Sequence, residues 1–280
     1  MKINTLIAIT ISIAAVSCND SKSNVDKSTT MDSSKTSMYI KEDSITYSEG
    51  DTNMKGYVVY DDQSKAKRPA VLVVHEWWGL GDYTRSRAKQ LAELGFIAMA
   101  VDMYGDGKNG SNPAEAQALA MPFYKDPQLA YTRLNAAINK IKTYPQTDTS
   151  QIAAIGYCYG GNVVLNAAKL GADLKGVVSF HGNLTGVAPD KQKLKAKILI
   201  CHGASDKFVK QEEVDAFKHA MDSAGIAYTF KSYPDATHAF TNPASTANGK
   251  KFSMPIEYNA AADSSSWNEM KSFFGKIFNK

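Results

Sequence analysis

Residues 152–165 read IAAIGYCYGGNVVL. The apolar run 152–155 is typical of a buried strand, and the run that starts at Asn162 is typical of a helix. Between them, GYCYGG is the G-x-S-x-G pattern of a nucleophile elbow with Cys158 in place of serine. Glycine is required two residues to either side, because a side chain there would clash with the adjoining strand and helix. A structural cysteine flanked by glycines by chance is the alternative interpretation.

Outward from this motif, apolar runs rich in β-branched residues alternate with segments of helical period. This alternation predicts a mostly parallel sheet covered by helices on both faces, and with the elbow it predicts the α/β-hydrolase fold as a single domain over residues 39–280. Residues 104–126, rich in Gly and Pro, are expected to form a loop with a short helix over one end of the sheet. The predicted strands are 55–60, 70–75, 97–102, 152–157, 176–181, 196–201 and 228–233, and the predicted helices are 84–94, 127–142, 161–170, 212–224 and 263–278.

A nucleophilic thiol needs a base and a group that orients the base, and in this fold they follow in the order acid and then histidine. Asp206 lies in a loop after the strand 196–201, and His238 lies in the loop after the strand 228–233. Their order after Cys158 is therefore the required one. Taken singly, Asp206 could be a turn or capping residue, and His238 could be a hydrogen-bonded surface histidine.

The segment HEWWG, residues 75–79, follows another apolar strand. The loop at this place supplies one backbone N–H of the oxyanion hole, so we expect the N–H of Trp77 to act together with that of Tyr159. A salt bridge or solvent exposure for Glu76, and simple packing for the tryptophans, are the alternatives.

With these four elements, the sequence resembles the dienelactone hydrolase family, also described as carboxymethylenebutenolidase-like, from about Ser44 to the C-terminus. The resemblance implies hydrolysis of an ester or lactone by a Cys158–His238–Asp206 triad through an acyl-thioester, with no cofactor and no metal. It also implies that Glu76 interacts with the resting nucleophile and helps to generate the thiolate.

The departures from the family concern the substrate. Characterised members hold a substrate carboxylate with arginines, one of them four residues after the catalytic histidine, where this chain has Asn242. Because residues 104–126 also lack arginine, a small neutral ester or lactone is as plausible as dienelactone. Trp78, Tyr124 and Phe240 are the predicted pocket residues.

The composition argues against some classes of partner, and two functions other than ester hydrolysis remain as alternatives. The net charge of +4 is small and the lysines are scattered, which argues against nucleic acid. The three cysteines indicate neither a disulfide framework nor a thiolate zinc site. A metal-dependent hydrolase remains an alternative, since four histidines fall at predicted strand ends, and so does a non-catalytic tethered binding module. The histidines are His75, His181, His202 and His238.

The N-terminus has the features of a targeting segment. Lys2 is followed by an apolar run too short to span a bilayer, and AVSC at residues 15–18 resembles a bacterial lipobox, which predicts a signal segment over 1–18 with lipidation at Cys18. An ordinary secretory signal or a buried helix is the alternative. Residues 19–38 are expected to be a flexible tether. The sequence thus predicts a monomer in the bacterial cell envelope, periplasm-facing or secreted, whose only membrane contact is the lipid anchor.

Overall fold

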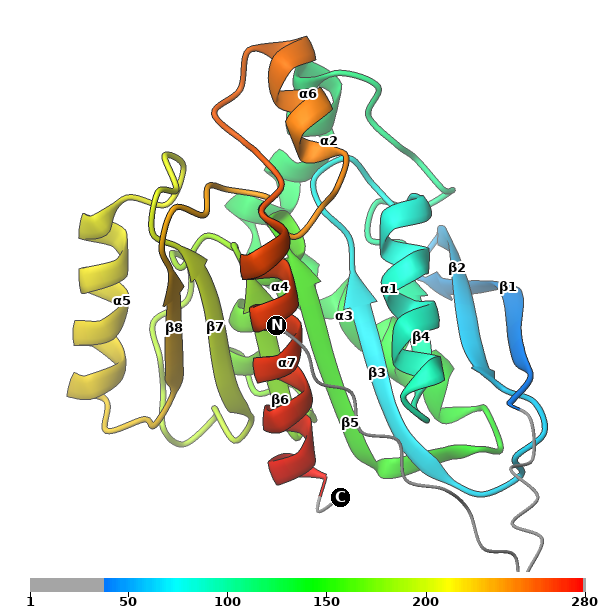
Figure 1. Ribbon diagram of the computed structural model, residues 1–280. Coiled ribbons are helices and arrows are strands. Elements are labelled where there is room, and N and C mark those ends of the chain that lie inside the picture. Colours follow the sequence, from blue (N-terminus) through cyan, green and yellow to red (C-terminus); the bar gives the residue numbers. More distant parts are fainter. Residues whose placement is uncertain (1–37, 279–280) are drawn as a thin grey trace, which may run out of the picture. The chain divides into compact units, whose positions relative to one another are not determined.

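The computed structural model describes residues 38–278, and these form one eight-stranded sheet flanked by helices (Figure 1). The strands are β1 (Ile40–Glu49), β2 (Thr52–Asp61), β3 (Arg68–Val74), β4 (Ile97–Val101), β5 (Thr147–Tyr157), β6 (Gly176–Phe180), β7 (Lys197–Gly203) and β8 (Thr229–Tyr233). The helices are α1 (Asp82–Glu93), α2 (Pro113–Lys125), α3 (Pro127–Lys142), α4 (Tyr159–Lys169), α5 (Gln211–Ser223), α6 (Ser245–Phe252) and α7 (Ala260–Ile277).

The sheet order is β1-β2-β4-β3-β5-β6-β7-β8. The strands from β4 to β8 pair in parallel, and β1 and β2 extend the sheet in antiparallel pairing. Every residue of β3, β4 and β6 is buried, as expected of strands covered on both faces. The predicted α/β-hydrolase fold is confirmed.

Two apolar cores lie on the two faces of the sheet. Leu91 of α1 and Phe274 of α7 pack on one face. Leu134 of α3, Val164 of α4 and Val214 of α5 pack on the other. Figure 1 shows α1 and α7 in front of the sheet and α2 and α6 above the carboxyl ends of its strands. Because the strands from β3 to β8 are parallel, their carboxyl ends all face α2 and α6, and loops that leave them meet there.

Three elements differ from the sequence-based expectation. Residues 104–112 form the expected loop, but the helix that follows, α2, has 13 residues and is longer than the short helix expected there. It starts where the side chain of Asn112 accepts the N–H of Glu115 and Pro113 opens the first turn, and it accommodates Pro122 in its interior. Strand β1 and helix α6 were not predicted. Strand β1 is an edge strand with only one buried residue, so its sequence carries little apolar alternation.

The predicted signal segment (1–18), the lipidation site Cys18 and nearly all of the tether (19–38) lie outside the described residues and stay predictions. Within residues 38–278, no helix has the length and hydropathy that crossing a membrane would need.

Candidate active site

Cys158 stands on a tight turn between β5 and α4, as the elbow motif predicts. Its backbone has φ +52° and ψ −115°, a conformation that a side chain rarely adopts. A Cβ on Gly156 would lie 2.0 Å from the carbonyl oxygen of Gly160, and one on Gly160 would lie 2.4 Å from that of Val74. The two glycines therefore let strand and helix approach closely enough for the turn to close. Cys158 sits at the N-terminus of α4, where the helix dipole and free backbone N–H groups favour negative charge.

The structure brings Cys158, His238 and Asp206 into one hydrogen-bonded row. His238 Nε2 lies 3.0 Å from Cys158 Sγ, and His238 Nδ1 lies 2.8 Å from Asp206 Oδ2. Asp206 also accepts the N–H groups of Phe208 and Val209 at 2.7 and 3.0 Å. The loops after β7 and β8 thus deliver the acid and the histidine to the cysteine from separate parts of the chain.

The electrostatics of this row favour a charged His238–Asp206 pair. Burial alone would lower the pKa of His238, but the charge of Cys158 and the hydrogen bond that His238 donates to Asp206 outweigh burial and raise that pKa well above its usual value. Burial also opposes ionisation of Asp206, yet the contact with His238 and the two backbone N–H groups hold its pKa below the usual range. Both shifts favour an imidazolium on His238 beside an ionised Asp206.

His181, at the end of β6, joins the cysteine turn to the loop that carries His238. The N–H of Cys158 donates to the carbonyl of Phe180 at 3.0 Å and to His181 Nδ1 at 3.1 Å. On the other side of the ring, His181 Nε2 lies 2.7 Å from Thr241 Oγ1, which lies 2.6 Å from the Tyr83 hydroxyl. Because burial lowers the pKa of His181 well below its usual value, the ring is neutral, with Nδ1 as acceptor and Nε2–H as donor.

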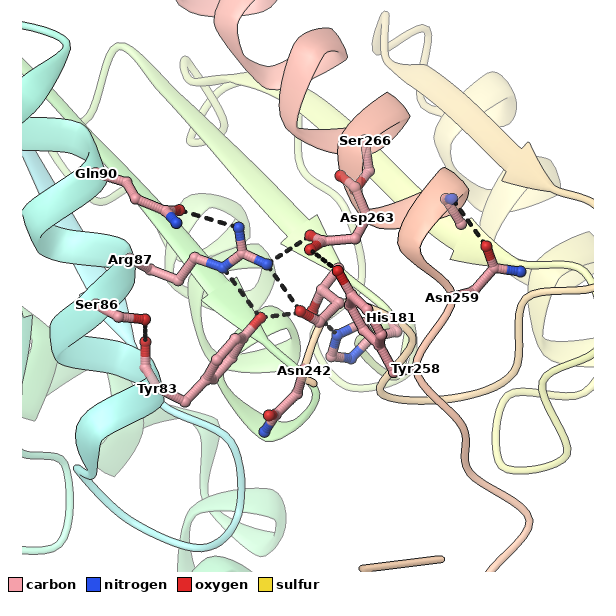
Figure 2. Close-up of polar contacts among 12 residues, drawn as sticks. Tyr83, Ser86, Arg87, Gln90, His181, Asn242, Tyr258, Asn259, Asp263 and Ser266 are labelled. Carbon is pink, nitrogen blue, oxygen red and sulfur yellow. Dashed lines mark hydrogen bonds and ion pairs between the residues drawn. The ribbon is translucent and has the colours of Figure 1, made fainter. Parts of the chain in front are cut away.

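Arg87 is the buried centre of this network (Figure 2). Its guanidinium donates to the carbonyl of Thr241 at 2.8 Å, to Asp263 at 2.5 Å and to the Gln90 side chain at 3.1 Å, and it contacts the Tyr83 hydroxyl at 3.4 Å. Helices α1 and α7 are thereby fastened to the histidine loop. No sequence motif indicated this role for Arg87, because its partners are far away in the chain.

Glu76 is buried beside the triad but forms no hydrogen bond with Cys158. Its Oε2 accepts the side-chain N–H of Asn242 at 2.6 Å. Burial raises the pKa of Glu76 to about 7, although Asn242 and the charges of His238 and Arg87 act in the opposite direction. In this structure the hydrogen-bond partner of Glu76 is Asn242, and the interaction with the nucleophile that the family resemblance implies stays a prediction.

The two amides predicted to form the oxyanion hole are both available. Within residues 38–278, neither the N–H of Trp77 nor that of Tyr159 has a hydrogen-bond acceptor in the chain. Gly160 donates to the carbonyl of His75 at 3.1 Å, which holds the HEWWG segment against the elbow. The two free N–H groups thus belong to segments in direct contact beside Cys158.

A cavity of about 390 Å³ opens onto Cys158, and residues of α2 and of the segment that follows α6 line it. Trp78 and Tyr124 line it, as predicted, whereas Phe240 does not: its ring is fully buried against Tyr233 and His181. The left-handed backbone of Ala239, φ +58°, separates the direction of His238 from that of Phe240. The lining consists of Glu76, Trp77, Trp78, Gln117, Ala120, Met121, Tyr124, Cys158, Asn183, Phe208, His238, Ala239, Met254 and Ile256.

The strand-end histidines do not form a metal centre. His75 accepts the N–H of Met103 through Nε2, His181 bridges the elbow and the histidine loop, and His238 belongs to the triad. Within residues 38–278, no three His, Cys, Asp or Glu side chains are grouped so as to hold a metal ion.

Fold and site together define an α/β-hydrolase with a cysteine at the nucleophile elbow. The family model of the dienelactone hydrolase family matches residues 54–278, and the chain belongs to this family.

Known proteins similar to this chain agree with that assignment. A dienelactone hydrolase-like promiscuous phosphotriesterase from metagenomic libraries has a TM-score of 0.80 and 32% identity, over 85% of this chain and 98% of that one. A solved structure named m3DLH has a TM-score of 0.79 and 31% identity over the same shares. An Escherichia coli K12 protein, provisionally assigned as a carboxymethylenebutenolidase, is 26% identical over 81% of this chain and 83% of its own length.

Proposed function

We propose that the protein hydrolyses carboxylic esters or lactones, with Cys158 as nucleophile, His238 as acid and base, and Asp206 as the group that orients His238. The observation that carries this proposal is the unbroken row from Cys158 Sγ through His238 to Asp206, at 3.0 and 2.8 Å, on the wall of the cavity. Membership of the dienelactone hydrolase family supports the reaction class.

The geometry supports a two-step reaction. The Cys158 thiolate attacks the carbonyl carbon, and the N–H groups of Trp77 and Tyr159 stabilise the oxyanion. The intermediate collapses to an acyl-thioester as the leaving alkoxide takes the proton of the His238 imidazolium. Neutral His238 then takes a proton from water, whose oxygen attacks the thioester, and the second intermediate releases the acid and restores the Cys158 thiolate.

The test is hydrolysis of short-chain p-nitrophenyl esters by the wild type, Cys158→Ala and Cys158→Ser. We expect Cys158→Ala to lose on the order of a thousandfold or more in kcat, as removal of a triad member does. Cys201→Ala is the matched control, because Cys201 is a buried thiol in β7 with no contact to the triad, and it should stay active.

Two outcomes would contradict the proposal. Equal activity of the wild type and Cys158→Ala would place the reaction elsewhere. Absence of turnover on any ester or lactone, together with no alkylation of Cys158 by iodoacetamide, would favour the tethered binding module.

Phosphotriester hydrolysis is a second candidate activity. The metagenomic relative at 32% identity is a phosphotriesterase. A phosphotriester carries no charge, which suits a cavity whose lining holds no Lys or Arg among the described residues. An aryl dialkyl phosphate, assayed with the same cysteine variants, tests whether this activity shares Cys158.

A further inference from the structure

The lining of the active-site cavity includes an acidic side chain but no lysine or arginine. Of its 14 lining residues, none is a lysine or arginine, and the one carboxylate is Glu76. Nine of the others are apolar or aromatic, among them Trp77, Trp78, Met121 and Ile256. A substrate in this cavity therefore meets no fixed cation except the imidazolium of His238, which is already paired with Cys158 and Asp206.

Cations close to the cavity are committed to other partners or separated from it. Arg87 acts on Glu76 through its charge, but its guanidinium is fastened to Asp263 and to the carbonyl of Thr241. Lys207 and Lys250 line a neighbouring cleft, which shares only Met254 and Ile256 with the cavity.

We propose, on the basis of the ester or lactone hydrolase function above, that this site selects uncharged substrates with an apolar acyl or alcohol group and disfavours substrates that carry a carboxylate. Binding a carboxylate here removes its hydration without supplying a counter-ion, and above about pH 7 it also places the charge in the same cavity as ionised Glu76. An uncharged ester exchanges water for the aromatic and methionine side chains of the walls, which is favourable.

The first experiment compares two substrates that differ in the charge of the distal group and by one methyl group: mono-p-nitrophenyl glutarate and its methyl ester. Both have the same acyl chain and leaving group, so the ratio of their kcat/KM values reports the effect of the distal carboxylate. For the wild type we expect the methyl ester to be preferred by roughly tenfold or more, as an uncompensated charge in a partly solvated site implies.

The second experiment changes the cavity charge at Gln117. This residue is an exposed position of α2 that lines the cavity and has no contact with the triad, so substitutions there should leave folding intact. We expect Gln117→Arg to raise kcat/KM for the anionic ester by roughly five- to tenfold, and Gln117→Glu to lower it by a similar factor. The methyl ester carries no charge, so its kcat/KM in each variant measures any effect of the substitution other than charge, and the ratio of the two substrates isolates the charge effect.

Failure of the inference and failure of the proposed function give different results. If the wild type cleaves the anionic ester as well as the methyl ester in a Cys158-dependent manner, charge selection is refuted while the hydrolase function stands. If neither ester is cleaved and other esters also fail, the proposed function itself is refuted. If Lys250→Met abolishes cleavage of an anionic ester that the wild type accepts, the neighbouring cleft supplies the missing cation and the inference is overturned.

Discussion

Replacing Glu76 by glutamine should change how stability depends on pH. The carboxyl group is buried with Asn242 as its hydrogen-bond partner, and burial raises its pKa from the ordinary 4.5 to about 7. Between these two pH values the folded protein keeps a proton on Glu76 that the unfolded chain has released. The free energy of unfolding of the wild type therefore loses a contribution as pH rises through this window. Glutamine cannot ionise, and its amide oxygen can still accept from Asn242.

The expected magnitude follows from the same two values. One pH unit corresponds to about 1.4 kcal/mol, so the window from 4.5 to about 7 gives about 3 kcal/mol as an upper value. Relative to the wild type, Glu76→Gln should gain about 2–3 kcal/mol of stability between pH 5 and pH 8. Above pH 8 the difference should be constant, because Glu76 is then ionised in both folded and unfolded states.

Urea denaturation followed by far-UV circular dichroism, at fixed pH values from 5 to 8, measures this difference. Glu93→Gln is the matched control, since Glu93 is an exposed residue of α1, and its curve should run parallel to that of the wild type. A pH-independent difference for Glu76→Gln would refute the reasoning, because it would mean that the carboxylate keeps its hydration in the folded protein.

Two further substitutions test the scaffold. Asp263→Asn leaves the guanidinium of Arg87, 7% exposed, without its counter-ion, and should lower the free energy of unfolding in urea by about 3 kcal/mol. The double variant Arg87→Met/Asp263→Leu should recover most of that loss. A cost below about 1 kcal/mol for Asp263→Asn would contradict a buried ion pair. Gly156→Ala places a Cβ 2.0 Å from the carbonyl oxygen of Gly160 and should lower either the folded yield or kcat by about a hundredfold or more. Gly81→Ala is the control, because a Cβ there meets nothing within 4 Å and should change neither quantity. An active Gly156→Ala enzyme would refute the close-approach argument.

The row of triad residues was predictable because it depends on chain order and strand ends. A parallel sheet brings all carboxyl ends of its strands to one edge, so Cys158, Asp206 and His238 meet once the strands that precede them are recognised. The confirmed fold followed from the same buried apolar runs. The catalytic roles of these residues remain the proposal above.

The surroundings of the triad were not predictable, because they depend on side-chain directions and on weakly apolar segments. Helix α6, STANGKKF, has no apolar stripe that could distinguish it from a loop. Phe240 follows His238 by two residues, yet the left-handed turn at Ala239 sends its ring into the core. The partner of Glu76 could not be read from a motif either, since Asn242 meets it across 166 residues of sequence.

Part of the cavity wall comes from segments outside the sheet, whereas the triad is carried by turns attached to the sheet. Cys158, Asp206 and His238 are carried by turns directly attached to the sheet, whereas Gln117 and Met254 belong to α2 and to the segment after α6, which contribute no strand. Library mutagenesis of the cavity-facing side chains of α2 could therefore change substrate choice with little effect on the reactive atoms, whereas the segment after α6 also pairs with His238 through Ile256. For protein engineering, α2 is therefore the element to vary, and the turns that carry the triad are the elements to keep.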